Sequence, residues 1–202
     1  MPGKLITFAG IDGAGKSSHL APVEQWLLER GHQVLVTREP GGSELAEQLR
    51  SMVLSTDMDG LTEALLVFAA RRDHWRTKIS PALTGGCVVV SDRFVDCSFA
   101  FQGGGRGVDW QVLEQLEAAV LGGVRPDITL WFDLPVAEAV GRRADRPADR
   151  FESEAVAFHA RARAGYQRRM ERDPHRFVRV DASRPREQVL QAVLEGLEAR
   201  GL

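Results

Sequence analysis

The stretch that most constrains the fold lies at residues 8–18 and reads FAGIDGAGKSS. Gly10 to Ser17 fit the pattern G-x-x-x-x-G-K-[ST], directly after an apolar run and before an amphipathic segment. Glycines let the backbone N–H groups of such a loop turn inward, where larger side chains would block a phosphate. The stretch therefore predicts a strand, a phosphate-binding loop and a helix in succession, with a nucleoside triphosphate as ligand. A flexible turn with a chance lysine is the alternative.

Short apolar runs alternate with longer amphipathic segments along the rest of the chain. Strands are predicted over residues 4–9, 33–37, 87–91, 128–133 and 176–181. Helices are predicted over about 15–30, 43–54, 61–84, 110–121, 136–144, 152–172 and 186–199. This alternation predicts an α/β fold of three layers (α/β/α), in which helices flank a five-stranded parallel sheet.

Composition limits the classes of protein to which the chain can belong. Its 202 residues are enough for one well-packed domain, and no apolar run approaches the roughly 20 residues that span a membrane. The N-terminus does not resemble a signal peptide, so we expect a cytoplasmic protein without a membrane partner. We expect Cys87 and Cys97 to be reduced. A net charge of −2 argues against nucleic acid as a partner.

Candidate residues for the chemistry follow from the loop and from the third predicted strand. Lys16 would supply a charge for the β- and γ-phosphates, and the hydroxyl of Ser17 would bind Mg²⁺. Asp92 ends the third strand, where a carboxylate can hold the same metal ion or cap the next helix. Arg93 follows it, and a planar guanidinium beside the metal suggests a second phosphate-bearing ligand.

Several further motifs resemble those of the thymidylate kinase family. They are TREPGGS (37–43), DR (92–93), FQGGGRG (101–107), RPDITLWFDLP (125–135), DRFE (149–152) and VDAS (180–183), and together with the loop they cover essentially the whole chain. The resemblance implies a single P-loop kinase domain over residues 1–202, which transfers the γ-phosphate of ATP to dTMP. It also implies Mg²⁺ as cofactor and a homodimer. The GGGRG part could also be only a flexible loop.

On the dTMP side, the resemblance implies a role for each matching position. Arg38 and Arg93 would grip the phosphate, Asp12 would face the sugar, and Arg71 would address the thymine base. The remaining positions would contact base or sugar: Ser98, Phe101 and Gln102. Phe101 would lie beside the C2′ carbon.

On the ATP side, the resemblance implies binding by the loop, by a mobile lid at about 141–152 and by a turn near adenine. The loop residues are Gly10, Ile11, Asp12, Gly13, Ala14, Gly15, Lys16, Ser17 and Ser18, and the turn residues are Ala182 and Ser183. Arg142, Arg143, Arg146 and Arg150 lie in the lid stretch. Arg146 is the first choice for the catalytic lid arginine, with Arg142 and Arg143 as alternatives. From charge pattern alone, these arginines could also form a solvated, salt-bridged surface.

One position departs from the family pattern. Relatives place a phenylalanine four residues before the position of Arg71, where it stacks on thymine, and this chain has Val67 there, followed by Phe68. Phe68 lies roughly 100° further round a helix. Either the base rests on Val67, or a shift of the helix brings Phe68 to it. Because Val67 removes one family marker, a kinase for another nucleoside monophosphate is one alternative function. An ATP-dependent switch or binding module is an alternative from another class.

Overall fold

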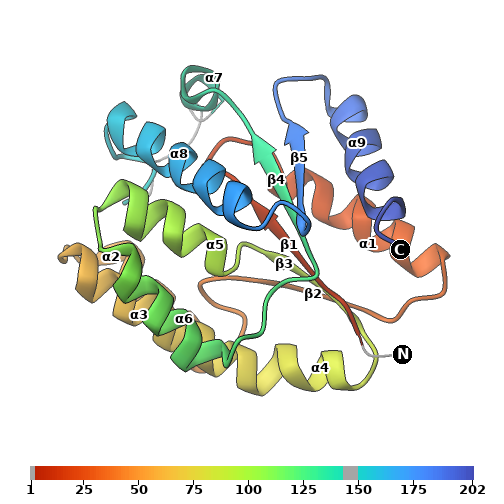
Figure 1. Cartoon of the computed structure of the whole chain (residues 1–202), viewed down its shortest axis with the longest axis horizontal. Coiled ribbons are helices and arrows are strands. Elements are labelled where there is room, and N and C mark those ends of the chain that lie inside the picture. The colour runs from red at the N-terminus through yellow and green to blue at the C-terminus, as the bar shows by residue number, and fades with distance from the viewer. Residues whose placement is uncertain (1–2, 143–149) are drawn as a thin grey trace.

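The computed structural model describes residues 3–142 and 150–202 and contains a parallel sheet of five strands. The strands have the order β2-β3-β1-β4-β5, and every neighbouring pair is parallel (Figure 1). Their bounds are β1 Leu5–Ala9, β2 Val34–Arg38, β3 Val88–Asp92, β4 Ile128–Asp133 and β5 Phe177–Asp181. The predicted α/β class and all five strands are confirmed, each to within one residue.

Helices cover both faces of this sheet (Figure 1). Helices α1 and α9 lie on one side, and helices α3, α6 and α8 lie on the other. The helical segments are η1 Lys16–His19, α1 Leu20–Glu29, α2 Glu44–Ser55, α3 Gly60–His74, η2 Trp75–Ile79, α4 Ser80–Thr84, α5 Val95–Ser98, η3 Phe99–Gly105, α6 Trp110–Leu121, α7 Val136–Gly141, α8 Val156–Arg172 and α9 Arg186–Glu198.

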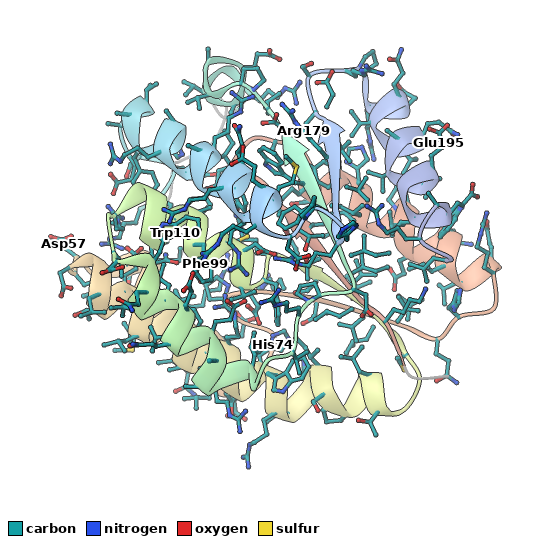
Figure 2. The ribbon with its side chains drawn as sticks, in the orientation of Figure 1. Asp57, His74, Phe99, Trp110, Arg179 and Glu195 are labelled. Atoms are coloured by element: carbon teal, nitrogen blue, oxygen red, sulfur yellow. The ribbon has the colours of Figure 1, made fainter. Side chains whose placement is uncertain are left out.

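Alternate side chains of the central strand divide the core between the two faces. Ile6 and Phe8 of β1 belong to a buried cluster that includes Val23 of α1 and Val193 of α9. Leu5 points the other way and packs in a second cluster with α3 and α6. Burial on both faces explains why the central strands are almost continuously apolar. In this second cluster, Phe99 of η3 packs edge to face on Trp110 of α6, with ring centroids 5.2 Å apart (Figure 2).

The predicted helix over 61–84 is three consecutive segments. Helix α3 passes into the π-helical segment η2, and α4 then begins with Ser80 and Pro81. Pro81 has no N–H and cannot make the α-helical hydrogen bond to the carbonyl four residues earlier, so a regular helix cannot run through it. No helix is predicted between Val95 and Gly105, but the structure has α5 and η3 there.

The glycines at 103–105 are part of the π-helical segment η3 and do not form a flexible loop. They allow a close approach to helix α8. A Cβ on Gly104 would lie 2.5 Å from the carbonyl oxygen of Arg161, and a Cβ on Gly105 would lie 2.4 Å from the ring of Phe158. Close packing of two helical backbones therefore accounts for this motif.

No helix within residues 3–142 and 150–202 is both long enough and apolar enough to cross a membrane.

Candidate nucleotide-binding site

The phosphate loop lies at the carboxyl end of β1, in the middle of the sheet. Gly13 and Gly15 adopt φ values of +85° and +81°, a backbone conformation that favours glycine. A Cβ on Gly13 would also lie 2.5 Å from the carbonyl oxygen of Ala139. The loop leads directly into η1 and α1, as the sequence predicted. A phosphate at this helix start would meet backbone N–H groups and the positive end of the helix dipole.

Lys16 is buried, and its ammonium group is held by the loop itself. Its Nζ donates to the carbonyl oxygens of Gly10 and Ile11, both at 2.9 Å. Burial, followed by the repulsion of Arg93, lowers the pKa of Lys16 from 10.5 to about 8. Keeping Lys16 charged therefore costs the folded protein free energy. A bound phosphate would stabilise the charged form.

The side chains of Asp92 and Ser17 fit a magnesium ion. Asp92 ends β3 and lies in register with Phe8 of the central strand. Among the described residues, its buried Oδ1 atom has no hydrogen-bond partner. Ser17 is exposed in the first helical turn after the loop. A buried carboxylate oxygen without a donor and a hydroxyl at the phosphate loop are both ligands that Mg²⁺ prefers.

Arg93 is fixed beside the phosphate loop by three contacts. Its Nη2 donates to Oδ1 of Asp12, its Nη1 donates to the carbonyl oxygen of Gly10 at 3.2 Å, and the guanidinium carbon lies 5.1 Å from the centre of the Phe101 ring. Burial opposes the charge of Arg93, but the carboxylate of Asp12 outweighs it and raises the pKa of the guanidinium above its ordinary value. Its backbone is also unusual, with φ at +68°. Such a conformation is costly for arginine and is found mainly at functional positions.

A pocket opens beside Arg93 and the loop, and we call it the side pocket. It contains six residues that the sequence analysis predicted for one ligand, and Val67 as a seventh: Asp12, Val67, Arg71, Arg93, Ser98, Phe101 and Gln102. Its other lining residues are Glu39, Pro40, Arg50, Val53, Leu54, Phe94, Cys97 and Phe151. The pocket thus brings together residues from five separate parts of the sequence: residue 12, the ranges 39–54, 67–71 and 93–102, and residue 151.

Arg71 is buried in the wall of the side pocket and is held by two side chains. Its Nε donates to Oε2 of Glu39 at 2.7 Å, and its Nη1 donates to the hydroxyl oxygen of Ser98 at 3.1 Å. Glu39 in turn contacts Nδ1 of His74 at 3.3 Å, and Nε2 of His74 lies 2.7 Å from the hydroxyl of Thr37. The cost of burying the arginine is offset by a paired carboxylate, and the guanidinium is held in one orientation.

Val67 and Phe68 lie in different surroundings. Val67 lines the side pocket, one helical turn before Arg71. Phe68 is 1 % exposed and belongs to the core cluster with Ala64 and Leu113. The helix keeps a regular register here, so the structure does not bring the ring of Phe68 to the pocket.

The far wall of the side pocket is aromatic. The ring of Phe101 packs edge to face against Phe151 at 5.8 Å and against Phe158 at 5.9 Å. Beside it, the buried Gln102 donates from Nε2 to Oε1 of Glu63 at 2.8 Å. This wall is rigid because aromatic packing and a buried hydrogen bond hold it from behind.

Arg38 does not line the side pocket in this structure. Its side chain is 57 % exposed, and its Nη2 donates to Oε2 of Glu47 at 3.0 Å. Its backbone lies next to Asp92 in the sheet, at the same carboxyl edge as the phosphate loop. The pair with Glu47 is exposed and therefore weak, and an anionic ligand can replace it.

On the opposite side of the phosphate loop, α7 approaches the turn after β5. Arg142 donates from Nη1 to the carbonyl oxygen of Ala182 at 3.0 Å. The neighbouring Ser183 donates from its backbone N–H and its hydroxyl to Asp181. Arg186 then donates to the carbonyl oxygen of Ser18 at 3.0 Å, which ties this turn to the helix that follows the loop. Arg142, an alternative for the catalytic lid arginine, thus lies beside Ala182 and Ser183, which are predicted to contact ATP.

The predicted lid falls partly outside the described residues. Arg143 and Arg146, the latter our first choice for a catalytic arginine, lie in the segment 143–149, which is not described. Arg150 is described and lies behind the side pocket, where it contacts α3 and the segment before it. Its Nη1 donates to Glu63, and its Nη2 donates to the carbonyl oxygen of Met58 at 3.1 Å.

Sequence reasoning missed about half of the side pocket. Glu39 and Pro40 stand in the motif TREPGG and could have been included from it. Arg50, Val53 and Leu54 lie at spacings of three and four residues on α2, so one helix face carries them to the pocket. Phe151 stands in the motif DRFE and could have been included in the same way, whereas Phe94 and Cys97 carry no local signal.

Comparisons with known proteins agree with this geometry. The family model described as "Thymidylate kinase" matches residues 8–193. The chain is similar to a thymidylate kinase of Burkholderia thailandensis, at 53 % identity over 98 % of both chains. It is also similar to one of Paracidovorax citrulli, at 51 % identity over 99 % of this chain and 95 % of the relative. Among solved structures, the thymidylate kinase of Ehrlichia chaffeensis is similar with a TM-score of 0.80, at 32 % identity over 98 % of this chain and 99 % of that one.

Proposed function

Because the chain belongs to the thymidylate kinase family, whose members phosphorylate dTMP to dTDP with ATP, we propose that ATP and dTMP meet at the phosphate loop from opposite sides. In this proposal the loop and the turn after β5 bind ATP, and the side pocket binds dTMP. One observation carries it: Asp12 and Arg93 join the loop to the wall of a separate pocket that also contains Arg71.

The reaction needs two anions held close together, with their negative charges neutralised. Lys16 and Arg93 stand at the junction of the two binding regions, and both donate to the carbonyl oxygen of Gly10. A phosphate offers each of them a stronger acceptor than this carbonyl. Lys16 would bind the phosphates of ATP, and Arg93, oriented by Asp12, would bind the phosphate of dTMP. Arg38 would exchange Glu47 for the same phosphate.

Ser17 and Asp92 would hold Mg²⁺, which, when bound, neutralises charge on the phosphate oxygens of ATP. The fit is supported by the buried Oδ1 of Asp92, which has no partner among the described residues. No general base is needed, because the phosphate of dTMP is already an anionic nucleophile.

The base and sugar of dTMP would be recognised by Arg71, Ser98, Phe101 and Gln102. Arg71 has only donors, and it therefore suits a carbonyl oxygen of thymine and rejects the amino group of cytosine. Ser98 accepts from Arg71, and its hydroxyl remains able to contact the base. The ring of Phe101 would lie against C2′ and exclude a ribose hydroxyl. Val67 would supply an apolar contact to the base.

We also propose a homodimer formed through α2 and α3. These two helices expose four large apolar side chains: Leu45, Met52, Leu61 and Leu65. Apolar side chains gathered on one face of a molecule are typical of a protein–protein contact. Leu113 and Leu121 of α6, by contrast, are buried in the core. The cytoplasmic location and the mobile lid at 141–152 stay predictions.

A coupled assay of ADP release across a panel of monophosphates tests the proposed site. We expect dTMP to be the best acceptor and dUMP to be a moderately poorer one, because a methyl group in an apolar pocket contributes about 1–3 kcal/mol. We expect dCMP and ribonucleotides to be poor acceptors, because each would leave a buried polar group mismatched. Comparable turnover of all four would contradict the assignment of the pocket. Partner-dependent hydrolysis without an acceptor would instead indicate an ATP-dependent switch.

A further inference from the structure

Glu63 on α3 is a fully buried carboxylate behind the side pocket, and it is not among the residues that line it. Three donors from distant parts of the chain converge on it. Gln102 donates from Nε2 to Oε1 at 2.8 Å, Arg106 donates from Nε to Oε2 at 3.1 Å, and Arg150 donates from Nη1 to Oε2. All three groups are donors, so the Glu63 carboxylate is the acceptor in each of these hydrogen bonds.

This arrangement fixes the side-chain amide of Gln102 in one orientation. Since Glu63 is only an acceptor, the amide nitrogen of Gln102 must face it, and the amide oxygen must face away. Gln102 lines the side pocket, and the structure gives its Oε1 no partner among the described residues. The pocket therefore receives an acceptor from Gln102, opposite in polarity to the donors of Arg71.

The same carboxylate anchors the aromatic wall. Arg150 is bound to Glu63 and also donates to the carbonyl oxygens of Val53 at 3.5 Å and Met58 at 3.1 Å. The next residue, Phe151, lines the side pocket and packs edge to face on Phe101. Fixing Arg150 therefore fixes the ring that closes this side of the pocket.

We propose that Glu63 is a positioning residue for the acceptor nucleotide, which sets the orientation of the Gln102 amide and anchors Arg150 and Phe151 against the pocket. Glu63 does not itself touch the ligand in this proposal. The inference rests on dTMP binding in the side pocket, and it adds a residue that neither the motifs nor the pocket lining indicate.

The test is Glu63→Gln, measured by steady-state ADP release with dTMP and ATP varied separately. A glutamine at 63 keeps the volume but lets the Gln102 amide turn over, which presents a donor where the pocket had an acceptor. We expect the KM for dTMP to rise about ten-fold and the KM for ATP to change less than about two-fold, since one buried hydrogen bond is lost on one side only. An equal rise of both KM values would overturn the proposal.

A double-mutant cycle with Gln102→Ala separates positioning from general destabilisation. If Glu63 acts through Gln102, Glu63→Gln adds little to the KM for dTMP once Gln102 is alanine. If the two substitutions instead raise the KM for dTMP by factors that multiply in the double variant, Glu63 does not act through Gln102. Glu154→Gln is the matched control, because Glu154 binds Arg106 in the same cluster without touching Gln102 or Arg150. We expect it to leave both KM values unchanged.

Glu63→Gln removes the negative charge that Arg106 and Arg150 share. Two partly buried cations without that charge can unfold the protein. A double variant that carries both Glu63→Gln and Arg106→Gln restores the charge balance. It is compared with the single variant Arg106→Gln. A selective rise in the KM for dTMP relative to that reference supports the proposal, and no difference overturns it. Failure of the proposed function would look different, because the unmodified protein would then release no ADP with dTMP.

Discussion

Lys16 and Arg93 donate hydrogen bonds to the same carbonyl oxygen, that of Gly10, at 2.9 and 3.2 Å. Two cations held this close repel each other, and the repulsion from Arg93 adds to burial in lowering the pKa of Lys16 to about 8. Asp12 offsets part of this repulsion through its ion pair with Arg93. The folded protein thus stores an unfavourable concentration of positive charge at the point where two phosphorylated ligands would meet.

This arrangement predicts that ATP binding takes up a proton above pH 8. The free protein has Lys16 partly neutral there, and the phosphates of ATP stabilise its charged form. Calorimetric titrations in buffers of different ionisation enthalpy measure this uptake, and Lys16→Met should abolish it together with turnover. Equal apparent enthalpies in all buffers would contradict the lowered pKa.

The same pKa predicts how stability depends on pH. Lys16 has a lower pKa folded (about 8) than its ordinary value of 10.5, so between these values the unfolded chain binds more protons than the folded one. The free energy of unfolding should therefore rise with pH across this window, relative to Lys16→Met. Urea denaturation of both proteins at a series of pH values checks the sign of the difference.

Arg38→Ala should weaken the use of dTMP more than the binding of ATP. The exposed pair of Arg38 with Glu47 contributes little to stability, so the free energy of unfolding should change by less than about 1 kcal/mol. The control is Arg30→Ala, which removes another exposed pair, with Glu198 on α9. A larger effect of Arg38→Ala on ATP than on dTMP would reverse the assignment of the two binding regions.

Asp92→Asn should shift the dependence of turnover on Mg²⁺ to higher concentrations. An amide is a poorer ligand for Mg²⁺ than a carboxylate, and no other partner among the described residues holds Oδ1 of Asp92. Rates of ADP release at increasing Mg²⁺ measure the shift. Asp109→Asn is the control, because Asp109 caps α6 and asparagine caps equally well. Coincident magnesium curves for the two variants would remove Asp92 from the metal site.

Val67→Ala and Phe68→Leu should have similar effects on stability and different effects on catalysis. Both positions are almost completely buried, so each change should lower the free energy of unfolding by about 1–2 kcal/mol. The KM for dTMP should rise only for Val67→Ala, because only Val67 lines the side pocket. A rise limited to Phe68→Leu would mean that the base contacts Phe68.

Leu65→Glu should dissociate the proposed dimer. Leu65 is 50 % exposed on α3, and a charge there would be buried without a partner in an apolar contact. Leu28→Glu is the matched control, since Leu28 is 47 % exposed on α1, on the other side of the sheet (Figure 1). Sedimentation equilibrium measures the mass of each variant, and a monomeric unmodified protein would contradict the proposal.

The resemblance names seven of the fifteen residues that line the side pocket, but it does not predict how each residue is held. Arg71 was assigned to the thymine base from its motif, and the structure adds its ion pair with Glu39, 32 residues away. Gln102 was assigned in the same way, and its bond to Glu63 spans 39 residues. No periodicity joins such positions, because the first contact forms only when α3 packs beside the segment after β2, and the second only when α3 packs against η3.

Phe68 and the glycines at 103–105 show what cannot be predicted from neighbouring residues in the sequence. The sequence left Val67 and Phe68 as alternatives, and helix α3 decides between them by turning Phe68 into the core. The glycines permit either a flexible loop or a close helix contact, and the neighbouring α8 decides for the contact.

The sequence by itself determined the phosphate loop, the five strands and the parallel sheet. These depend on interactions between residues near each other in the chain: the backbone freedom of glycine, the burial of apolar runs and the alternation of strand and helix. Only the tertiary structure decided which polar and charged side chains contact one another. An example is the group of Glu63, Gln102, Arg106 and Arg150. Buried charges are stable only with partners in exact positions, and packing alone brings such distant partners together.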